Sequence, residues 1–260
     1  MSEFDRVDTR RKLRIGSLFS GIGMLELGLE AALDGRTVWQ VESAAFPRSI
    51  LAKHWPDASR DVTDVNDAGA HNLERVDLIC GGFPCQNLSQ ANNSTQTGLN
   101  GEKSGLWGQY ERIIHELRPR YVVVENNGPA WRQWVPVVRA SLWVRGYSSV
   151  PIRLRASDVG APHKRDRVFV VAWSVASDAD GQGEPLRPID AKVAGLRKAS
   201  GPHKWSTDSV PLGVDDRGPT RVDRLRLRAL GNAVVPQVAF EIGLELARRA
   251  QRGPSKQSKR

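Results

Sequence analysis

The sequence predicts an α/β fold in which a parallel sheet is covered by helices on both faces. Segments of strand character alternate with segments of helical periodicity along the first two thirds of the chain. The expected strands are almost continuously apolar, which is typical of strands buried on both faces. A chain of 260 residues suffices for one large domain, because roughly three quarters of its unfolded surface is removed on folding.

Apolar periodicity, interrupted by glycine and proline, sets the order of the elements. Five strands are expected, at 13–19, 37–41, 76–80, 121–125 and 168–173. Helices alternate with the later strands or follow the last one, and we expect them at 24–33, 46–54, 106–117, 131–143, 221–230 and 234–250. Between 174 and 219, glycine, proline, aspartate and serine are frequent and apolar periodicity disappears, so only short pieces of structure are expected there.

The charge of the chain favours a polyanionic partner. The 38 Lys and Arg against 29 Asp and Glu give a net charge of +9, which indicates nucleic acid first and an anionic membrane surface second. No apolar run approaches the roughly 18 residues that a spanning helix needs, so we expect no membrane association of that kind. The charged segment 1–14 lacks a signal-peptide stretch, and a cytoplasmic location is expected.

The two cysteines differ in their surroundings. Because there are only two, a disulfide framework is excluded and zinc ligation is poorly supported, so no metal is expected. Cys80 lies inside an apolar strand, as a small buried hydrophobe does. Cys85 follows Gly-Gly-Phe-Pro at the end of that strand, where open parallel sheets bind their ligands. It precedes a polar stretch, 86–104, that is too long for an idle connection. Cys85 is therefore a candidate nucleophile.

The turn Ser20-Gly21-Ile22-Gly23 follows the first strand and is typical of a nucleotide-binding loop, in which small residues let a ligand approach backbone amides. Glu26 stands where the dinucleotide fingerprint has its third glycine, and a carboxylate near the ligand suits a cationic or zwitterionic group better than a pyrophosphate. Glu42, at the tip of the second strand, is where a ribose-binding acid is expected. Packing of helix on sheet is the alternative explanation for the glycines.

Two further features carry charged side chains, and the first of them ends on the same predicted edge of the sheet as Cys85. Glu125 closes the fourth strand and is a candidate general acid, with a turn-capping role as the alternative. Arg165 and Arg167 lie two positions apart on an extended segment leading into the fifth strand, and a solvated charged face is the alternative for them.

The content and order of these motifs resemble the DNA (cytosine-5)-methyltransferase family. The motifs are Phe19-Ser20-Gly21-Ile22-Gly23, Pro84-Cys85-Gln86, Glu125-Asn126, the Arg-x-Arg segment and Gly231-Asn232-Ala233-Val234-Val235-Pro236. The resemblance covers nearly the whole chain except about 174–219. The segment from Arg221 to Asn232 is similar to compact phage or prophage members with a reduced target-recognition region.

The resemblance implies a Rossmann-like sheet that uses S-adenosyl-L-methionine and releases S-adenosyl-L-homocysteine. It implies a catalytic domain formed by 13–173 and 221–250 and a reduced target-recognition segment at 174–220. The basic, polar composition of 251–260 predicts a disordered tail. The resemblance also implies methylation of carbon 5 of cytosine in duplex DNA, as in restriction-modification systems, by a protein that we expect to be monomeric. The target base must leave the duplex to be reached.

The resemblance assigns roles to single residues. Cys85 adds to carbon 6 of cytosine, Glu125 protonates or hydrogen-bonds ring nitrogen 3, Arg167 contacts the base carbonyl, and Arg165 supports the catalytic loop or phosphates. The implied cofactor residues are Phe19, Ser20, Gly21, Gly23, Glu42, Asp61, Val62, Gly82, Pro84, Leu106, Asn232 and Ala233. The expected DNA contacts are Gln86, Ser89, Arg187, Arg197, Lys204 and Trp205.

Three positions depart from the family pattern: His163 replaces the usual Gln, Asn127 an apolar residue and Met24 a Gly. Two other functions stay open. One is methylation of cytosine in tRNA, and the other is DNA binding without catalysis. Because the interval 174–219 offers few base contacts, we expect a short target, on the order of two to four base pairs, or relaxed specificity.

Overall fold

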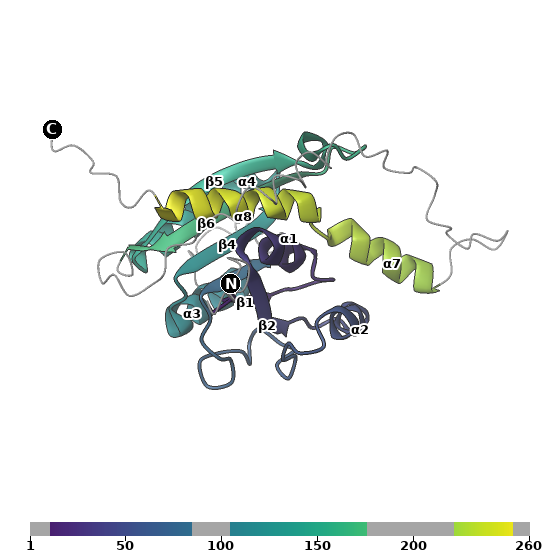
Figure 1. Cartoon of the computed structure of the whole chain (residues 1–260), viewed down its shortest axis with the longest axis horizontal. Helices are drawn as coiled ribbons and strands as arrows, with labels where there is room; N and C mark the ends of the chain where they lie inside the picture. The colour runs from purple at the N-terminus through teal and green to yellow at the C-terminus, as the bar shows by residue number, and fades with distance from the viewer. Residues whose placement is uncertain (1–10, 85–104, 176–220, 252–260) are drawn as a thin grey trace, which may run out of the picture.

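The computed structural model describes residues 11–84, 105–175 and 221–251 (Figure 1). The strands are β1 (Leu13–Leu18), β2 (Gly35–Val41), β3 (Leu78–Gly82), β4 (Tyr121–Asn127), β5 (Tyr147–Arg155) and β6 (Asp166–Ser174). The helices are α1 (Met24–Leu33), α2 (Ala45–His54), α3 (Gly105–Leu117), α4 (Trp131–Val144), α7 (Arg221–Asn232) and α8 (Pro236–Gln251), with a short 3₁₀ helix at Ala156–Val159. None of the helices in these ranges is long and apolar enough to cross a membrane.

The expected α/β fold is confirmed, and every expected strand or helix begins and ends within two residues of its prediction. The six strands form one sheet in the order β2-β1-β3-β4-β6-β5. β2, β1, β3 and β4 pair in parallel, as expected for strands joined through helices. The expectation of a wholly parallel sheet is wrong, because β6 pairs antiparallel with both β4 and β5.

The sequence analysis also missed β5, the edge strand. Tyr147 is its one buried residue, while Ser148, Ser149 and Pro151 interrupt the apolar alternation by which strands are recognised. A proline is tolerated on an edge strand, since one side of such a strand needs no ladder hydrogen bonds. Because β5 lies outside β6, the segment that follows β5 returns directly to pair with it and needs no helical crossover.

The core lies in two layers, one on each face of the sheet (Figure 1). α3 and α4 cover one face, where Trp107, Tyr110 and Trp134 are buried. α1 and α8 cover the other face, and Leu29 of α1 and Ile242 of α8 are fully buried there. Helices therefore cover both faces of the sheet, as expected.

Two glycines let α1 and α8 approach closely although they lie near opposite ends of the chain. A Cβ atom on Gly28 would collide with the carbonyl oxygen of Pro236 and lie 2.5 Å from Cβ of Ala239. A Cβ atom on Gly243 of α8 would lie 2.5 Å from Cβ of Ala32 on α1. Each helix thus contributes one glycine to the contact, and the backbones pack where side chains normally intervene.

Replacing Gly28 tests this close approach. Gly28→Ala should lower the free energy of unfolding by about 1–3 kcal/mol, the usual cost of overpacking, even though alanine is the better helix former. Gly108 on α3 provides a matched control, because it is exposed and a Cβ atom there meets nothing within 4 Å. Gly108→Ala should leave the stability unchanged or raise it by up to about 1 kcal/mol. Chemical denaturation followed by circular dichroism measures both, and equal stability of the two variants would contradict the packing.

Candidate active site

The turn after β1 has the conformation expected of a ligand-binding loop. Gly21 and Gly23 have positive φ angles of 56° and 82°, which favour glycine. The amide of Gly23 donates to the Ser20 carbonyl at 3.0 Å and closes the turn. A Cβ atom on Gly23 would collide with the Trp55 ring, whereas one on Gly21 meets no atom within 4 Å. The turn is therefore packed on one side and open at Gly21.

Glu42 lies at the end of β2 against this turn. Its Oε2 accepts the amide of Gly21 at 2.8 Å, and its Oε1 accepts the amide of Ala44 at 2.8 Å. A carboxylate has about four acceptor positions, so two remain for a ligand. Two acceptor positions are what the pair of hydroxyl groups on a ribose requires.

The next side chains are among those that the sequence assigned to the cofactor. Phe19 is half-buried and stacks on Tyr110, with ring centroids 6.3 Å apart, so its other face is partly exposed. Val62 and Leu106 are half-buried and pack against the same core cluster. Asp61 is exposed and accepts a hydrogen bond from Ser59 at 2.9 Å. A half-buried aromatic ring directly before the Ser20–Gly23 turn is suited to stacking on a purine ring.

Glu26 lies in the core, although the sequence suggested a carboxylate near the ligand. Its exposed fraction is 0%, and neither carboxylate oxygen has a hydrogen-bond partner among the described residues. Burial raises its pKa to about 7, and the nearby side chains of Ser17 and Gln40 oppose that rise. Its carboxyl group therefore faces the space between α1 and the sheet rather than an open site.

Glu125 is a buried acid at the end of β4. A Cβ atom on Gly82, its register partner on β3, would collide with Glu125 Oε2, so the glycine provides the space that the carboxyl group occupies. Arg167 Nε lies 2.8 Å from Glu125 Oε1, and the two form an ion pair without the alignment of a hydrogen bond. Burial raises the pKa of Glu125 to about 7, while Arg167 and Arg165 act in the opposite direction. Both protonation states are thus populated near neutral pH.

Asp166, the first residue of β6, lies between the two arginines and is held by neighbouring residues. Asp166 accepts hydrogen bonds from Nε of Arg153 at 2.9 and 3.0 Å, and these bonds lower the pKa of Asp166. Asp166 also accepts the Gly128 amide through its backbone carbonyl at 3.1 Å. Arg165 donates from Nη1 to the Gly231 carbonyl at 2.7 Å, while its buried Nε and Nη2 have no hydrogen-bond partner among the described residues.

Asn126 has a role that the sequence analysis did not assign. It is buried, and its Nδ2 donates to the Phe83 carbonyl at 2.9 Å, one residue before Pro84. Asn127, a departure from the family pattern, accepts the Ala130 amide at its Oδ1 and caps the turn before α4. The two adjacent asparagines were the signal in the sequence for these backbone contacts, because asparagine side chains commonly form hydrogen bonds with nearby backbone groups.

The remaining expected residues are placed as follows. Pro84, Asn232, His163 and Asp61 are exposed, while Ala233 and Met24 are half-buried. The carbonyl of Gly231, one residue before Asn232, accepts the hydrogen bond from Arg165. The following expected residues lie outside the described part of the chain: Cys85, Gln86, Ser89, Arg187, Arg197, Lys204 and Trp205. The structure thus brings together Gly21 with Glu42, and Gly82 with Glu125 and Arg167.

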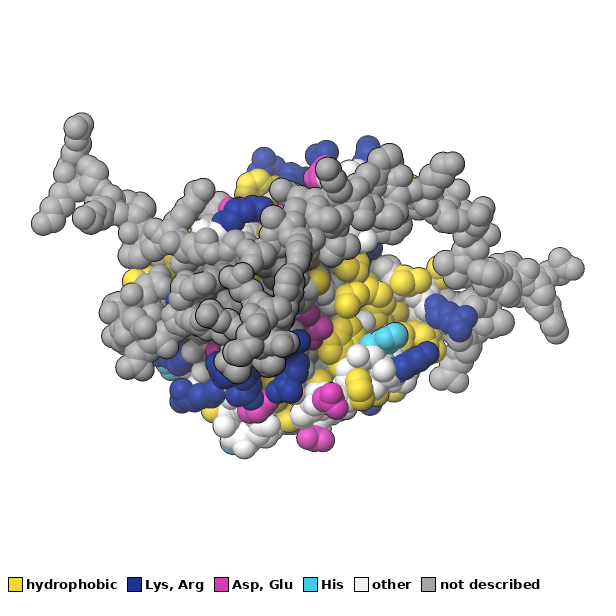
Figure 2. Space-filling view, viewed as in Figure 1, with side chains coloured by type: hydrophobic (Ala, Val, Ile, Leu, Met, Phe, Trp, Pro, Cys, Tyr) yellow, Lys and Arg dark blue, Asp and Glu magenta, His cyan; other side chains and the backbone are white. Residues whose placement is uncertain are grey.

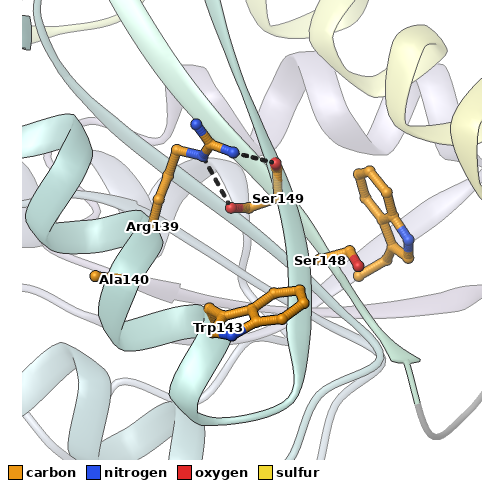
Figure 3. Close-up of a pocket in the computed structure, with 6 residues that line it drawn as sticks. Arg139, Ala140, Trp143, Ser148 and Ser149 are labelled. Carbon is orange, nitrogen blue, oxygen red and sulfur yellow. Dashed lines mark hydrogen bonds between the residues drawn. The ribbon is translucent and has the colours of Figure 1, made fainter. Parts of the chain in front are cut away.

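A separate cavity of about 350 Å³ lies between α4 and β5 and is lined by Arg139, Ala140, Trp143, Ser148, Ser149 and Trp173 (Figure 3). Arg139 reaches across it to Ser149, with its Nη2 3.3 Å from the Ser149 carbonyl oxygen. Trp173 is at the opposite end of β6 from Arg167, so this cavity is distinct from the candidate active site. Within residues 11–84, 105–175 and 221–251, no three His, Cys, Asp or Glu side chains are grouped as metal ligands would be.

Comparisons with known proteins agree with this geometry. The model of the family described as C-5 cytosine-specific DNA methylase matches residues 13–195. The Type II methyltransferase M2.BsuMI of Bacillus subtilis is 30% identical over 172 residues, covering 62% of this chain and 42% of the relative. The orphan methyltransferase M.Rho11sI of Bacillus phage rho11s is 27% identical over 218 residues, covering 76% and 42%.

A solved structure also resembles the chain. It is a putative DNA modification methyltransferase encoded within an E. coli prophage, with a TM-score of 0.52 and 26% identity, covering 70% of this chain and 54% of that one. The chain spans about half the length of the curated relatives that it matches.

The buried Glu26 makes stability depend on pH in a defined direction. Its folded-state pKa of about 7 exceeds the ordinary 4.5, so between these values the folded chain holds a proton that the unfolded chain releases. Stability from this group therefore falls as the pH rises through that window. Glu26→Gln should raise the free energy of unfolding by up to about 3 kcal/mol at pH values above about 7, and much less below about pH 5. Urea denaturation at both pH values measures it, and an equal effect at the two would refute the shift.

Proposed function

Because the chain belongs to the family of C-5 cytosine-specific DNA methylases, we propose that it transfers a methyl group from S-adenosyl-L-methionine to carbon 5 of cytosine in duplex DNA. The observation that supports this most directly is the buried Glu125, beside Arg167 and next to the strand end that leads to Pro84 and Cys85. Carbon 5 of cytosine is a poor nucleophile. Methylation there needs an enzyme nucleophile that adds to the cytosine ring and an acid that acts on the same ring.

Glu125 has the properties that a general acid requires. With its pKa raised to about 7, a large share of the carboxyl groups holds a proton near neutral pH, ready for nitrogen 3 of the base. Arg167 keeps the carboxyl group oriented from 2.8 Å and also favours the carboxylate that remains after transfer. With nitrogen 3 of the base at Glu125, we propose that Arg167 contacts the neighbouring carbonyl group of the base.

Cys85 is the proposed nucleophile. Its thiolate adds to carbon 6, the electron pair moves toward nitrogen 3, and Glu125 stabilises the electron-rich ring there. After carbon 5 has received the methyl group, that carbon loses its proton and Cys85 is eliminated. The Asn126 bond to the Phe83 carbonyl supports this step, since it links the strand that carries Glu125 to the segment that leads into Cys85.

The donor residues fit S-adenosyl-L-methionine. When bound, this cofactor supplies an electrophilic methyl group on its sulfonium. Glu42 retains acceptor positions for the ribose, Phe19 presents a partly exposed ring for the adenine, and the open turn at Gly21 leaves room for the methionine part. The proposed contacts of Asp61, Val62, Gly82, Pro84, Leu106, Asn232 and Ala233 with the cofactor stay predictions.

The same proposal includes the division of the chain. We propose that residues 13–173 with 221–250 form the catalytic domain and that 174–220 read the target. The expected contacts from Gln86, Ser89, Arg187, Arg197 and Lys204, the cytoplasmic location and the monomeric state stay predictions.

The function is tested by methyl transfer from labelled donor to duplex DNA, with tRNA as the competing substrate. Wild type should label DNA, and on duplex DNA carrying 5-fluorocytosine it should form an adduct that survives denaturation, because fluorine cannot leave as a proton. Cys85→Ala should lose both activities while still binding the donor. Labelling of tRNA alone, or donor binding without any transfer, would reject the proposal in favour of one of its two alternatives.

Replacing the acid tests the proposed role of Glu125. Glu125→Gln should slow methylation by roughly 100- to 10,000-fold, the range for a positioned acid or base, because an amide cannot deliver the proton. Glu74→Gln is the matched control, since Glu74 is half-exposed and pairs with Arg14 at the amino end of β1, away from the carboxyl ends of the strands. Single-turnover rates measure both variants, and a Glu125→Gln rate like that of the control would remove Glu125 from the mechanism.

A further inference from the structure

Helix α7 presents basic side chains to solvent beside the candidate active site. Arg224, Arg226 and Arg228 are exposed, whereas Leu225 and Ala229 are half-buried and mark the side that faces the protein. Figure 2 shows Lys and Arg side chains at the right of the view, where Figure 1 places both α2 and α7. At helical spacing, Arg224 and Arg228 are four residues apart and therefore share one face.

The carboxyl end of α7 is bound by Arg165, one of the two arginines of the candidate site. Arg165 donates to the carbonyl of Gly231, in the last turn of α7, at 2.7 Å. A cation is favourable at that position, because the helix end carries partial negative charge. Arg165 is two residues from Arg167, which pairs with Glu125. The exposed arginines of α7 therefore begin next to the residues that would hold the flipped base.

The axial distances between Gly231 and the arginines of α7 are comparable to a few nucleotide rises of duplex DNA. A helix rises about 1.5 Å per residue, so Arg228 lies roughly 4.5 Å and Arg224 roughly 10.5 Å along the axis from Gly231. Each strand of duplex DNA rises about 3.4 Å per nucleotide. The two arginines thus lie about 6 Å apart along the axis, which corresponds to about two nucleotides, and Arg224 lies about three nucleotides from Gly231.

We propose that the face of α7 formed by Arg224 and Arg228 binds the phosphates of duplex DNA that flank the target cytosine. This inference rests on the proposed function and assigns α7 a part that differs from base recognition. Phosphate contacts fix the register and orientation of the duplex but carry no sequence information. The helix would hold the DNA at a constant position relative to Glu125 while other residues read the sequence.

The experiment compares variants of the full chain in their binding to one cytosine-containing duplex oligonucleotide, over about 50 to 200 mM salt. Each phosphate contact contributes about 0.9 to the slope of log affinity against log salt, so Arg224→Gln with Arg228→Gln should reduce that slope by about 2. The control is Lys12→Gln with Arg36→Gln, which removes the same charge near the amino ends of β1 and β2. The candidate site lies at the carboxyl ends of these strands. The control variant should leave the slope near that of wild type.

Two further variants separate the possible results. Arg224→Lys with Arg228→Lys keeps the charge and should restore most of the slope, which a folding defect would not allow. Leu227→Gln with Leu230→Gln alters the exposed leucines of the same helix and should leave the slope unchanged.

A wild-type slope in the Arg-to-Gln variant, or a loss in the leucine variant alone, would overturn the inference while leaving the proposed function intact. The proposed function itself fails if wild type neither binds duplex DNA nor methylates it. Donor binding, measured in every variant, should be unchanged and confirms that each is folded.

Discussion

The carboxyl group of Glu125 is buried at the end of β4, and a buried charge is expensive unless an opposite charge lies beside it. β6 supplies that charge because it runs antiparallel to β4. Its first residues, with Arg167, come to the same edge of the sheet as the last residues of β4. A parallel β6 would have carried Arg167 to the opposite edge, and the buried acid would have no ion pair.

The neighbouring residues are arranged around this ion pair. Gly82 has no side chain where the Glu125 carboxyl group lies, and Gly128 leaves room for Asp166. Arg153 on the edge strand holds Asp166, the residue adjacent to Arg167. Asp166 accepts hydrogen bonds from Arg153 on β5 and from the amide of Gly128 after β4, so the start of β6 is restrained in position as well as in direction.

Much of this could be predicted from the sequence, and the reasons are specific. The Tyr-Val-Val-Val run before Glu125 and the glycine turn after β1 carry strong local signals, and the motif order indicated which strand ends meet. The direction of β6 could not be predicted, because it depends on β5, whose Ser148, Ser149 and Pro151 hide the strand pattern. The space at Gly82 depends on the register between two strands. The burial of Glu26 was missed because a charged residue on a helix is expected at the surface.

The glycine contact between α1 and α8 also constrains how the chain is synthesised. α1 ends at Leu33 and α8 begins at Pro236, so about 200 residues are made between them. At the usual pace of about 5–20 residues per second, the ribosome needs on the order of 10–40 s for that interval. During this time Leu25, Leu29 and Ala32 have no α8 to cover them. The nascent chain therefore presents an apolar strip of the kind that chaperones recognise, and the sheet is complete on both faces only after the last helix has left the ribosome.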